Sequence, residues 1–219
     1  TVQRYETTTR YLEEFIKKEY QLSDIALNNL EANFISKFDA FLKIEKGCAQ
    51  NSAITRLKNL KKIIRIALEN DWIKKDPFAY YRFKPEKTDP EFLTMDEIKI
   101  ILAKEFTIKR VEQVRDIFVF CIFTGLAFSD VKDLSPEHLV KDNKGELWIR
   151  KNRQKTKIMC NIPVLPVAAS ILDKYKDVAE CTGKLLPVLC NQRMNSYLKE
   201  IADVCGIHKN LSTHVARHS

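Results

Sequence analysis

Residues 211–219 of this chain read Leu211-Ser212-Thr213-His214-Val215-Ala216-Arg217-His218-Ser219. A Ser/Thr pair directly before a histidine is typical of a helix N-cap, because its side-chain oxygen can accept a backbone N–H of the first turn. The spacing then places His214 and Arg217 on one face of that turn. An imidazole and a guanidinium at a helix N-terminus suit a phosphate group. The pattern H-x-x-R alone is also typical of a solvated basic helix end, so the rest of the chain has to decide.

The composition favours a polyanionic partner. The chain has 219 residues, 45% of them apolar, and a formal net charge of +8. Such a chain can form two modest hydrophobic cores, and its charge suits nucleic acid. No apolar run approaches the length of a membrane-spanning helix, so we expect no membrane partner.

Motifs for cofactors and metals are missing from the sequence. With five glycines and no Gly-rich loop, neither a phosphate loop nor a dinucleotide fingerprint can form, so we expect no cofactor. The six cysteines are scattered without a C-x-x-C pair, and some, such as Cys121, lie in apolar runs. We therefore expect no metal site and a reducing, cytoplasmic compartment.

Helical periodicity predicts three helices in the first part of the chain. They run from Thr7 to Glu19 after a threonine cluster, from about Leu30 to Glu45, and from near Gln50 to about Leu68. The third helix has four cations at positions i, i+3, i+4 and i+7: Lys58, Lys61, Lys62 and Arg65. A solvated face is the simpler interpretation, but four charges of one sign favour contact with DNA phosphates.

A linker then separates two predicted domains. Residues 79–92 contain Pro85 and Pro90 and show no apolar periodicity. We predict a helical domain over residues 1–80, a linker over 81–92 and a second domain over 93–219.

The second domain is predicted to mix helices with a small β-hairpin. A capping box at Thr94–Glu97 opens a helix, and an apolar helix over Val111–Phe123 precedes the turn Thr124-Gly125-Leu126. Two short strands flank the basic loop 150–157 and indicate a hairpin. The remaining predicted helices are Ser129–Leu134, Val167–Tyr175 and Gln192–Val204.

This order of parts resembles the tyrosine recombinases, the phage-integrase family. The matching features are the apolar helix, Thr-Gly-Leu, Asp130, the basic hairpin with Arg-Gln-Lys-Thr, the Leu-Pro segment, the long helix and H-x-x-R-H. The resemblance covers nearly the whole chain and is strongest to integrases of Bacteroides mobile elements. It implies a mainly α fold, with an N-terminal helical, SAM-like core-binding domain and a mixed α/β catalytic domain.

The resemblance also implies an activity, which is site-specific exchange of double-stranded DNA through a 3′-phosphotyrosyl intermediate. No metal or ATP is required in the family. Arg217 and His214 match residues that bind the scissile phosphate, and Lys155 matches the lysine that protonates the leaving 5′-oxygen, with Lys157 as its rival. Asp130 matches the acidic residue that orients these cations. Arg153 in the hairpin is expected to contact DNA.

Two positions depart from the family pattern. Ala127 stands where the family has its first arginine, and Arg115 on the preceding helix is our candidate replacement, although it could equally be a solvated residue at a helix start. The nucleophilic tyrosine of the family lies beyond H-x-x-R, and Tyr197 is more simply a packing residue. We therefore expect this chain to bind DNA without cleaving it.

The assembly and the alternative also follow from the resemblance. A full-length bacterial protein is expected to form a tetramer on DNA, and this chain alone a monomer. The alternative is a non-catalytic DNA-binding regulator on a recombinase scaffold.

Overall fold

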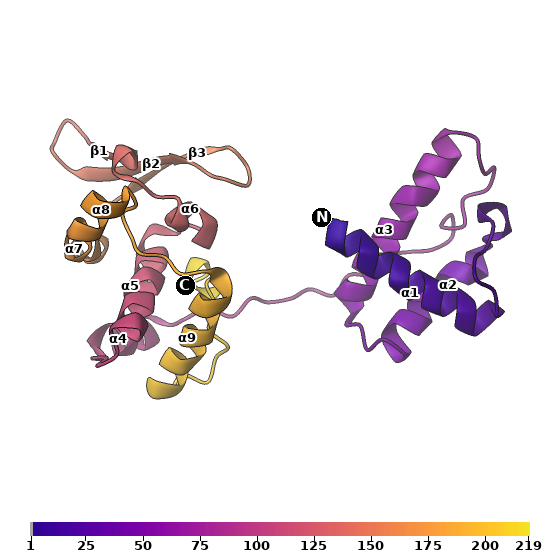
Figure 1. Ribbon diagram of the computed structural model, residues 1–219, viewed down its shortest axis with the longest axis horizontal. Helices are drawn as coiled ribbons and strands as arrows, with labels where there is room; N and C mark the ends of the chain where they lie inside the picture. Colours follow the sequence, from indigo (N-terminus) through magenta and orange to yellow (C-terminus); the bar gives the residue numbers. More distant parts are fainter. Residues whose placement is uncertain (1) are drawn as a thin grey trace. The chain divides into compact units, whose positions relative to one another are not determined.

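The computed structural model describes residues 2–219, apart from the side chain of Ala32. The chain forms two compact units, Thr1–Thr88 (unit 1) and Asp89–Ser219 (unit 2). Figure 1 shows unit 1 as helical and unit 2 as helices with a small sheet. Each unit has its own hydrophobic core.

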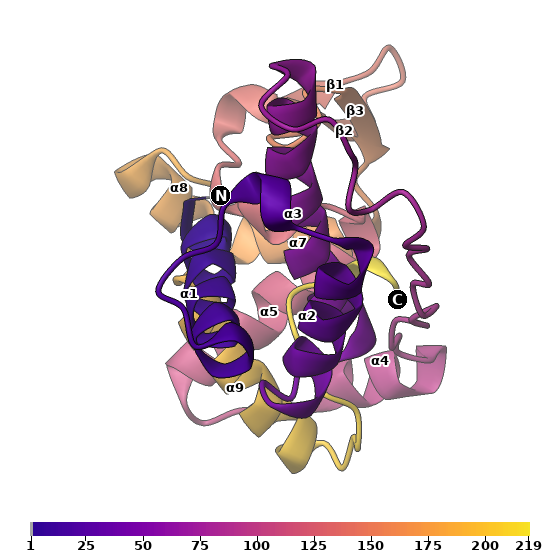
Figure 2. The ribbon, with the colours of Figure 1, turned by 90° about the vertical axis from the view of Figure 1, so that its right-hand side faces the viewer.

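Unit 1 is built from helices (Figure 2). Their buried side chains form a core rich in phenylalanine. Phe15 contacts the rings of Phe34, Phe38 and Phe41 at centroid distances of 5.1–5.4 Å. Its elements are α1 (Val2–Tyr20), the 3-10 turn η1 (Leu27–Asn29), α2 (Ala32–Ile44) and α3 (Gln50–Glu69).

The first helix begins earlier than its threonine cluster predicted. α1 already begins at Val2, so the threonines lie inside the helix and do not cap it. The hydroxyl of Thr7 donates to the carbonyl of Gln3, and that of Thr8 to the carbonyl of Arg4. A Ser/Thr hydroxyl can satisfy itself on the preceding turn in this way, so composition alone did not locate the start.

The predicted linker contains no helix or strand, but both of its ends are hydrogen-bonded. Asn51 at the start of α3 donates to the carbonyl of Glu86 (2.8 Å) and accepts its N–H (3.0 Å). At the other end, Glu91 accepts the N–H of Asn210 at 3.0 Å. The division between the units falls between Thr88 and Asp89, so each end of this segment is held by a different unit.

Unit 2 is organised around one buried helix. Most side chains of α5 (Lys109–Thr124) from Val114 to Cys121 are buried, and α4, α7, α9 and η3 all pack on it. It ends at Gly125, whose φ of 62° is the left-handed conformation that glycine adopts without strain. The helical elements of unit 2 besides α5 are α4 (Met95–Ala103), α6 (Phe128–Lys132), η2 (Pro136–His138), α7 (Pro166–Lys174), α8 (Lys176–Thr182), α9 (Asn191–Val204) and η3 (Val215–Arg217).

The sheet has three antiparallel strands in the order β1-β2-β3. They are β1 (Leu139–Lys141), β2 (Leu147–Asn152) and β3 (Met159–Pro163). In the register, Ile149 lies opposite Leu139 on one side and Ile162 on the other. Ile149 is fully buried, which joins the sheet to the core of unit 2. The sequence predicted the β2–β3 hairpin, whereas it held no signal for the three-residue strand β1 or for α8.

The predicted capping box is present at the start of α4. The Thr94 hydroxyl accepts the N–H of Glu97, and the Glu97 carboxylate accepts the N–H of Thr94. Lys209 adds a hydrogen bond to the same carboxylate at 2.6 Å. Burial alone would raise the pKa of Glu97, but the hydrogen bonds from Lys209 and Thr94 outweigh it, so the pKa lies below its ordinary value.

This carboxylate should make the stability of unit 2 depend on pH. A carboxyl whose pKa is lowered by folding stabilises the fold above its unfolded pKa, and the contribution is lost as pH falls through the folded value. Glu97→Gln should therefore reduce the free energy of unfolding at pH 7 by about 1 kcal/mol, and the deficit should shrink below about pH 4. Urea unfolding across pH measures this. Asp96→Asn is the matched control, because Asp96 lies in the same turn but is 88% exposed. A deficit that persists unchanged in acid would contradict the assignment.

Candidate phosphate-binding site and DNA-binding surface

The stretch that carries His214 and Arg217 forms a short 3-10 turn in place of the predicted α-helical start. His214 itself precedes η3, and no side chain caps the turn. The predicted Ser/Thr cap is wrong because Thr213 is engaged elsewhere. Its N–H donates to Asn195 at 2.9 Å, and its hydroxyl donates to Asn191 at 3.0 Å, both on α9.

Burial of two small residues explains how this turn presents its polar side chains. Val215 and Ala216 are buried in the core of unit 2, where η3 packs against α5. Their neighbours His214, Arg217 and His218 are exposed. The imidazole and the guanidinium of the H-x-x-R motif therefore lie at the surface of a well-anchored turn.

Asp130 joins helix α6 to the β2–β3 hairpin. The Asp130 side chain is 3% exposed, and one of its carboxylate oxygens accepts the N–H of Gln154 at 2.8 Å. Gln154 directly precedes Lys155 in the turn between β2 and β3, and Lys155 is exposed. A buried carboxylate thus fixes the backbone next to the predicted catalytic lysine.

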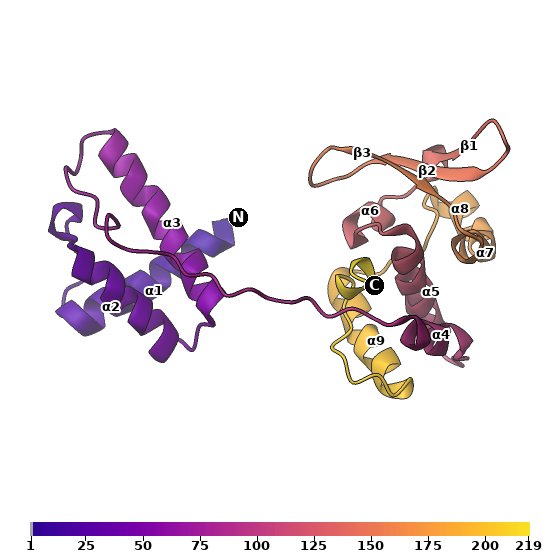
Figure 3. The same cartoon turned by 180° about the vertical axis from the view of Figure 1, so that it is seen from behind.

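The hairpin turn has its own internal bonds. The N–H of Arg153 donates to Ile158, and that of Lys157 to Arg153, both at 2.9 Å. Lys157 takes a left-handed conformation, with φ of 59°, which costs a non-glycine residue roughly 1 kcal/mol. The Nε of Arg153 donates to the sulfur of Cys160 at 2.8 Å, so part of this guanidinium is used across the hairpin. Figures 1 and 3 show this turn, α6 and the C-terminal turn on one side of unit 2.

Arg115 is mostly buried and hydrogen-bonded, unlike a solvated residue at a helix start. Its side chain is 13% exposed. The Nε donates to Asp116 at 2.6 Å, and one terminal nitrogen donates to the carbonyls of Leu102 and Lys104 at 3.1 Å each. These carbonyls end α4, so Arg115 joins α4 to α5 in this structure. The solvated alternative is wrong, and the role as a replacement arginine stays a prediction.

The four predicted DNA-binding cations of unit 1 lie along α3. Lys58, Lys62 and Arg65 are exposed, and Lys61 is half-buried. Arg65 has an acidic neighbour on its own helix, since its Nε lies 2.8 Å from Glu69. This pair is 76% and 57% exposed, so it contributes little stability and can exchange for a phosphate.

Sequence reasoning missed the aromatic support under two of these lysines. The ammonium of Lys61 lies 5.5 Å from the ring of Phe78 and 5.4 Å from that of Phe83, and Lys58 lies 5.9 Å from Phe83. The two rings stack at 6.1 Å. Attraction between a cation and a ring face holds the lysines in place. Because the rings lie in irregular segments, no periodic signal marked them.

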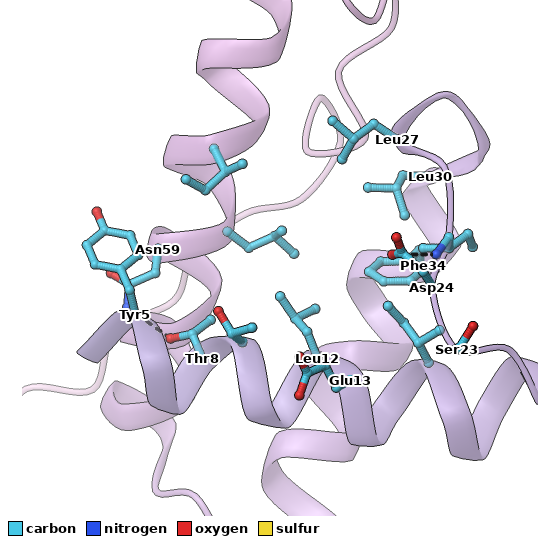
Figure 4. Close-up of a pocket in the computed structure, with 15 residues that line it drawn as sticks. Tyr5, Thr8, Leu12, Glu13, Ser23, Asp24, Leu27, Leu30, Phe34 and Asn59 are labelled. Atoms are coloured by element: carbon cyan, nitrogen blue, oxygen red, sulfur yellow. Dashed lines mark hydrogen bonds between the residues drawn. The ribbon is translucent and has the colours of Figure 1, made fainter. Parts of the chain in front are cut away.

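A separate hollow in unit 1 is unsuited to phosphate. It measures about 470 Å³ and lies between α1, α3 and residues 23–30, as Figure 4 shows. Apolar side chains such as Leu12 and Leu30 line it, and its charged residues are the acidic Glu13 and Asp24. The DNA-binding prediction therefore does not include this hollow.

Metal clusters and membrane spans are both missing from the part of the chain that the structure describes. Within 2–219, no group of three or more His, Cys, Asp or Glu side chains is placed to hold a metal ion. None of the helices in that range is long and apolar enough to cross a membrane.

The comparisons with known proteins agree with this architecture. Residues 1–85 match the family described as the phage integrase SAM-like domain. No curated protein matches the chain in sequence. Solved structures are similar over almost all of it, although the sequence identity is low.

Three of these structures show the range. The chain is 18% identical to lambda integrase bound to DNA, covering 99% of this chain and 76% of that one, with a TM-score of 0.75. The chain is 16% identical to the XerH site-specific recombinase bound to difH substrate, covering 100% of this chain and 66% of that one, with a TM-score of 0.75. It is 15% identical to the Tn1549 transposon integrase in complex with a circular intermediate DNA, covering 98% of this chain and 79% of that one, with a TM-score of 0.71. The chain therefore has the tyrosine recombinase fold. The predicted fold class, mainly α with a small antiparallel sheet, is confirmed.

The bond from Asp130 to the hairpin can be tested directly. Asp130→Ala removes a buried acceptor and should cost about 1–3 kcal/mol of stability, because the N–H of Gln154 loses its partner. Hydrogen exchange at the Gln154 amide should also become faster. Asp133→Ala is the control, since Asp133 follows the same helix and is 48% exposed. Unchanged exchange at Gln154 in Asp130→Ala would show that this bond does not order the hairpin.

Proposed function

We propose that this chain is the DNA-binding and phosphate-binding part of a site-specific tyrosine recombinase of the integrase type. The observation that carries the proposal is the fold match over 97–100% of the chain, with an integrase SAM-like match over residues 1–85. The matched structures are those of recombinases or integrases bound to DNA. The exposed cations on α3, on the hairpin and on the η3 turn support the same partner, double-stranded DNA.

The proposed reaction is an exchange of phosphodiester bonds. A tyrosine oxygen attacks the phosphorus of DNA, the bond to the 5′-oxygen breaks, and a 3′-phosphotyrosyl link forms; the reverse reaction on another strand restores the backbone. Lys155 would donate a proton to the leaving 5′-oxygen. His214 and Arg217 would hold the nonbridging oxygens, whose charge increases in the transition state. Asp130 positions the hairpin that carries Lys155 and does not itself contact DNA.

One cation of the proposed site has no obvious source. Ala127 precedes α6 and offers only a methyl group, and losing one such donor costs roughly 3–4 kcal/mol of barrier. Arg115 already uses Nε and one terminal nitrogen in bonds to Asp116 and to the carbonyls that end α4, so it could supply the charge through its other terminal nitrogen or by exchanging these bonds.

The tyrosines of unit 2 favour binding without cleavage by these 219 residues. Unit 2 contains two, Tyr175 and Tyr197. The hydroxyl of Tyr175 donates to Asp116 at 3.0 Å, and burial together with that carboxylate raises the pKa of the phenol, which makes it a poor nucleophile. The ring of Tyr197 on α9 lies under Arg110, 5.7 Å from its guanidinium carbon. We infer that the nucleophile of the recombinase is neither of them.

The proposal also covers the genetic element, the cell compartment and the oligomeric state. The similarity to a transposon integrase supports a mobile element, and we propose the Bacteroides type from the motifs Thr-Gly-Leu-Ala and Arg-Gln-Lys-Thr. We also propose a bacterial cytoplasmic protein associated with the nucleoid, monomeric as this chain and tetrameric on DNA in its full-length form. The alternative is a DNA-binding regulator that never cleaves, which Ala127 and the engaged tyrosines favour.

DNA binding should depend on the cations of α3. Changing Lys58, Lys61, Lys62 and Arg65 to glutamate should remove most of the salt-sensitive part of duplex binding. The slope of log K against log salt should become less negative by about 3 to 4 units, because each of the four cations neutralises one phosphate. Fluorescence anisotropy at several salt concentrations measures both. The matched control reverses the exposed lysines 99, 104, 176 and 199 of unit 2, which changes the net charge equally. Equal losses of affinity in the two variants would show that net charge, and not the position of these cations on α3, controls DNA binding.

Covalent trapping separates the two candidate functions. A nicked suicide duplex captures a phosphotyrosyl intermediate because the broken strand diffuses away. The 219-residue chain should bind this duplex and give no covalent adduct, whereas the full-length protein should give one that is lost in Lys155→Ala. An adduct at Tyr175 or Tyr197 would overturn our assignment of those residues. Binding without any adduct from the full-length protein would favour the regulator.

A further inference from the structure

The C-terminal turn contains a second histidine that the proposed mechanism does not use. The Nε2 atoms of His214 and His218 lie 3.2 Å apart. Their rings meet edge to face, with centroids 4.7 Å apart and planes at 88°. The two residues flank η3, His214 at its start and His218 at its end.

A hydrogen bond between two ring nitrogens restricts where the protons can be. One nitrogen must carry a hydrogen and the other must offer a lone pair. In the neutral pair, therefore, one ring is protonated on Nε2 and the other on Nδ1. In residues 2–219, the side chain hydrogen-bonded to the ring of His214 is that of His218.

The backbone around this pair is well fixed. Val215 and Ala216 are 7% and 1% exposed. The N–H of His218 donates to the carbonyl of Val215 at 2.9 Å. The hydroxyl of Ser219 donates to the same carbonyl and accepts the N–H of Leu93. Two exposed rings on such a turn keep their mutual geometry without further packing.

We propose that His218 is a positioning residue, which donates from Nε2 to Nε2 of His214 and so holds the proton of His214 on Nδ1. This inference rests on the proposed function, in which His214 donates a hydrogen bond to a phosphate oxygen. The opposite direction of donation would leave a lone pair on Nδ1 of His214, which repels the phosphate oxygen. Of the two arrangements of the neutral pair, only one leaves His214 with a donor for DNA.

The proton positions can be read by NMR. Long-range 1H–15N spectra of the 219-residue chain at about pH 8.5, well above the usual histidine range, distinguish a ring protonated on Nδ1 from one protonated on Nε2. We expect Nδ1 for His214 and Nε2 for His218.

Two variants and a control test the role of His218. His218→Phe keeps an aromatic ring without its nitrogens and should return His214 to mainly the Nε2 form. His218→Asn keeps a donor and should restore part of the Nδ1 form. His208→Phe is the control, because His208 is exposed on the same segment without contact to His214, and it should change nothing. Duplex affinity should fall roughly 2- to 10-fold in His218→Phe, as expected for one hydrogen bond, and less in His218→Asn.

The outcomes separate the inference from the function beneath it. A wild-type His214 protonated on Nε2, or one left unchanged by His218→Phe, overturns the role of His218 even when duplex binding persists. A wild-type chain that binds no duplex removes the proposed function, and the role of His218 at a phosphate falls with it, whatever the spectra show.

Discussion

Unit 2 depends on the burial of one helix, α5. Its side chains are enclosed by α4, α7, α9 and η3, so each of these elements is positioned by packing on the same surface. The helix is capped by Gly125, and α6 with Asp130 follows after a three-residue connection. The turn with His214 and Arg217 reaches the same helix through Val215 and Ala216. Residues far apart in the sequence acquire a fixed relation because they share this one core.

Polar contacts then refine what the core has placed. Asp130 is buried yet bound to the hairpin, so the backbone beside Lys155 is fixed while its side chain remains in solvent. Asn191 and Asn195 do the same for Thr213, just before His214. In both places a hydrogen bond orders the backbone, and the cationic or ionisable side chain next to it stays exposed. In the proposed function, such an arrangement would keep the cost of ordering low on phosphate binding.

The segment between the units is also held by hydrogen bonds. Glu91 binds Asn210, Leu93 binds Ser219, and Lys209 binds both Phe92 and Glu97. The last residues before α4 are therefore held by the same stretch, residues 209–219, that carries H-x-x-R. In unit 1, Asn51 holds the beginning of the segment through Glu86. The segment that the sequence predicted as a linker thus has a defined hydrogen-bond partner at each end.

Periodicity and local hydrogen bonding were enough to predict most of the helices, the β2–β3 hairpin and the capping box at Thr94 from the sequence, and the family resemblance added the fold class. The sequence also supplied the candidate residues, and their roles in a recombinase remain proposals. The folded structure was needed to see that Thr213 binds α9 and caps nothing, that Arg115 joins α4 to α5, and that Phe78 and Phe83 support the lysines of α3. It likewise revealed the His214–His218 pair. The physical reason is that a polar side chain chooses among partners brought close by packing, and a linear pattern records only its neighbours in the chain.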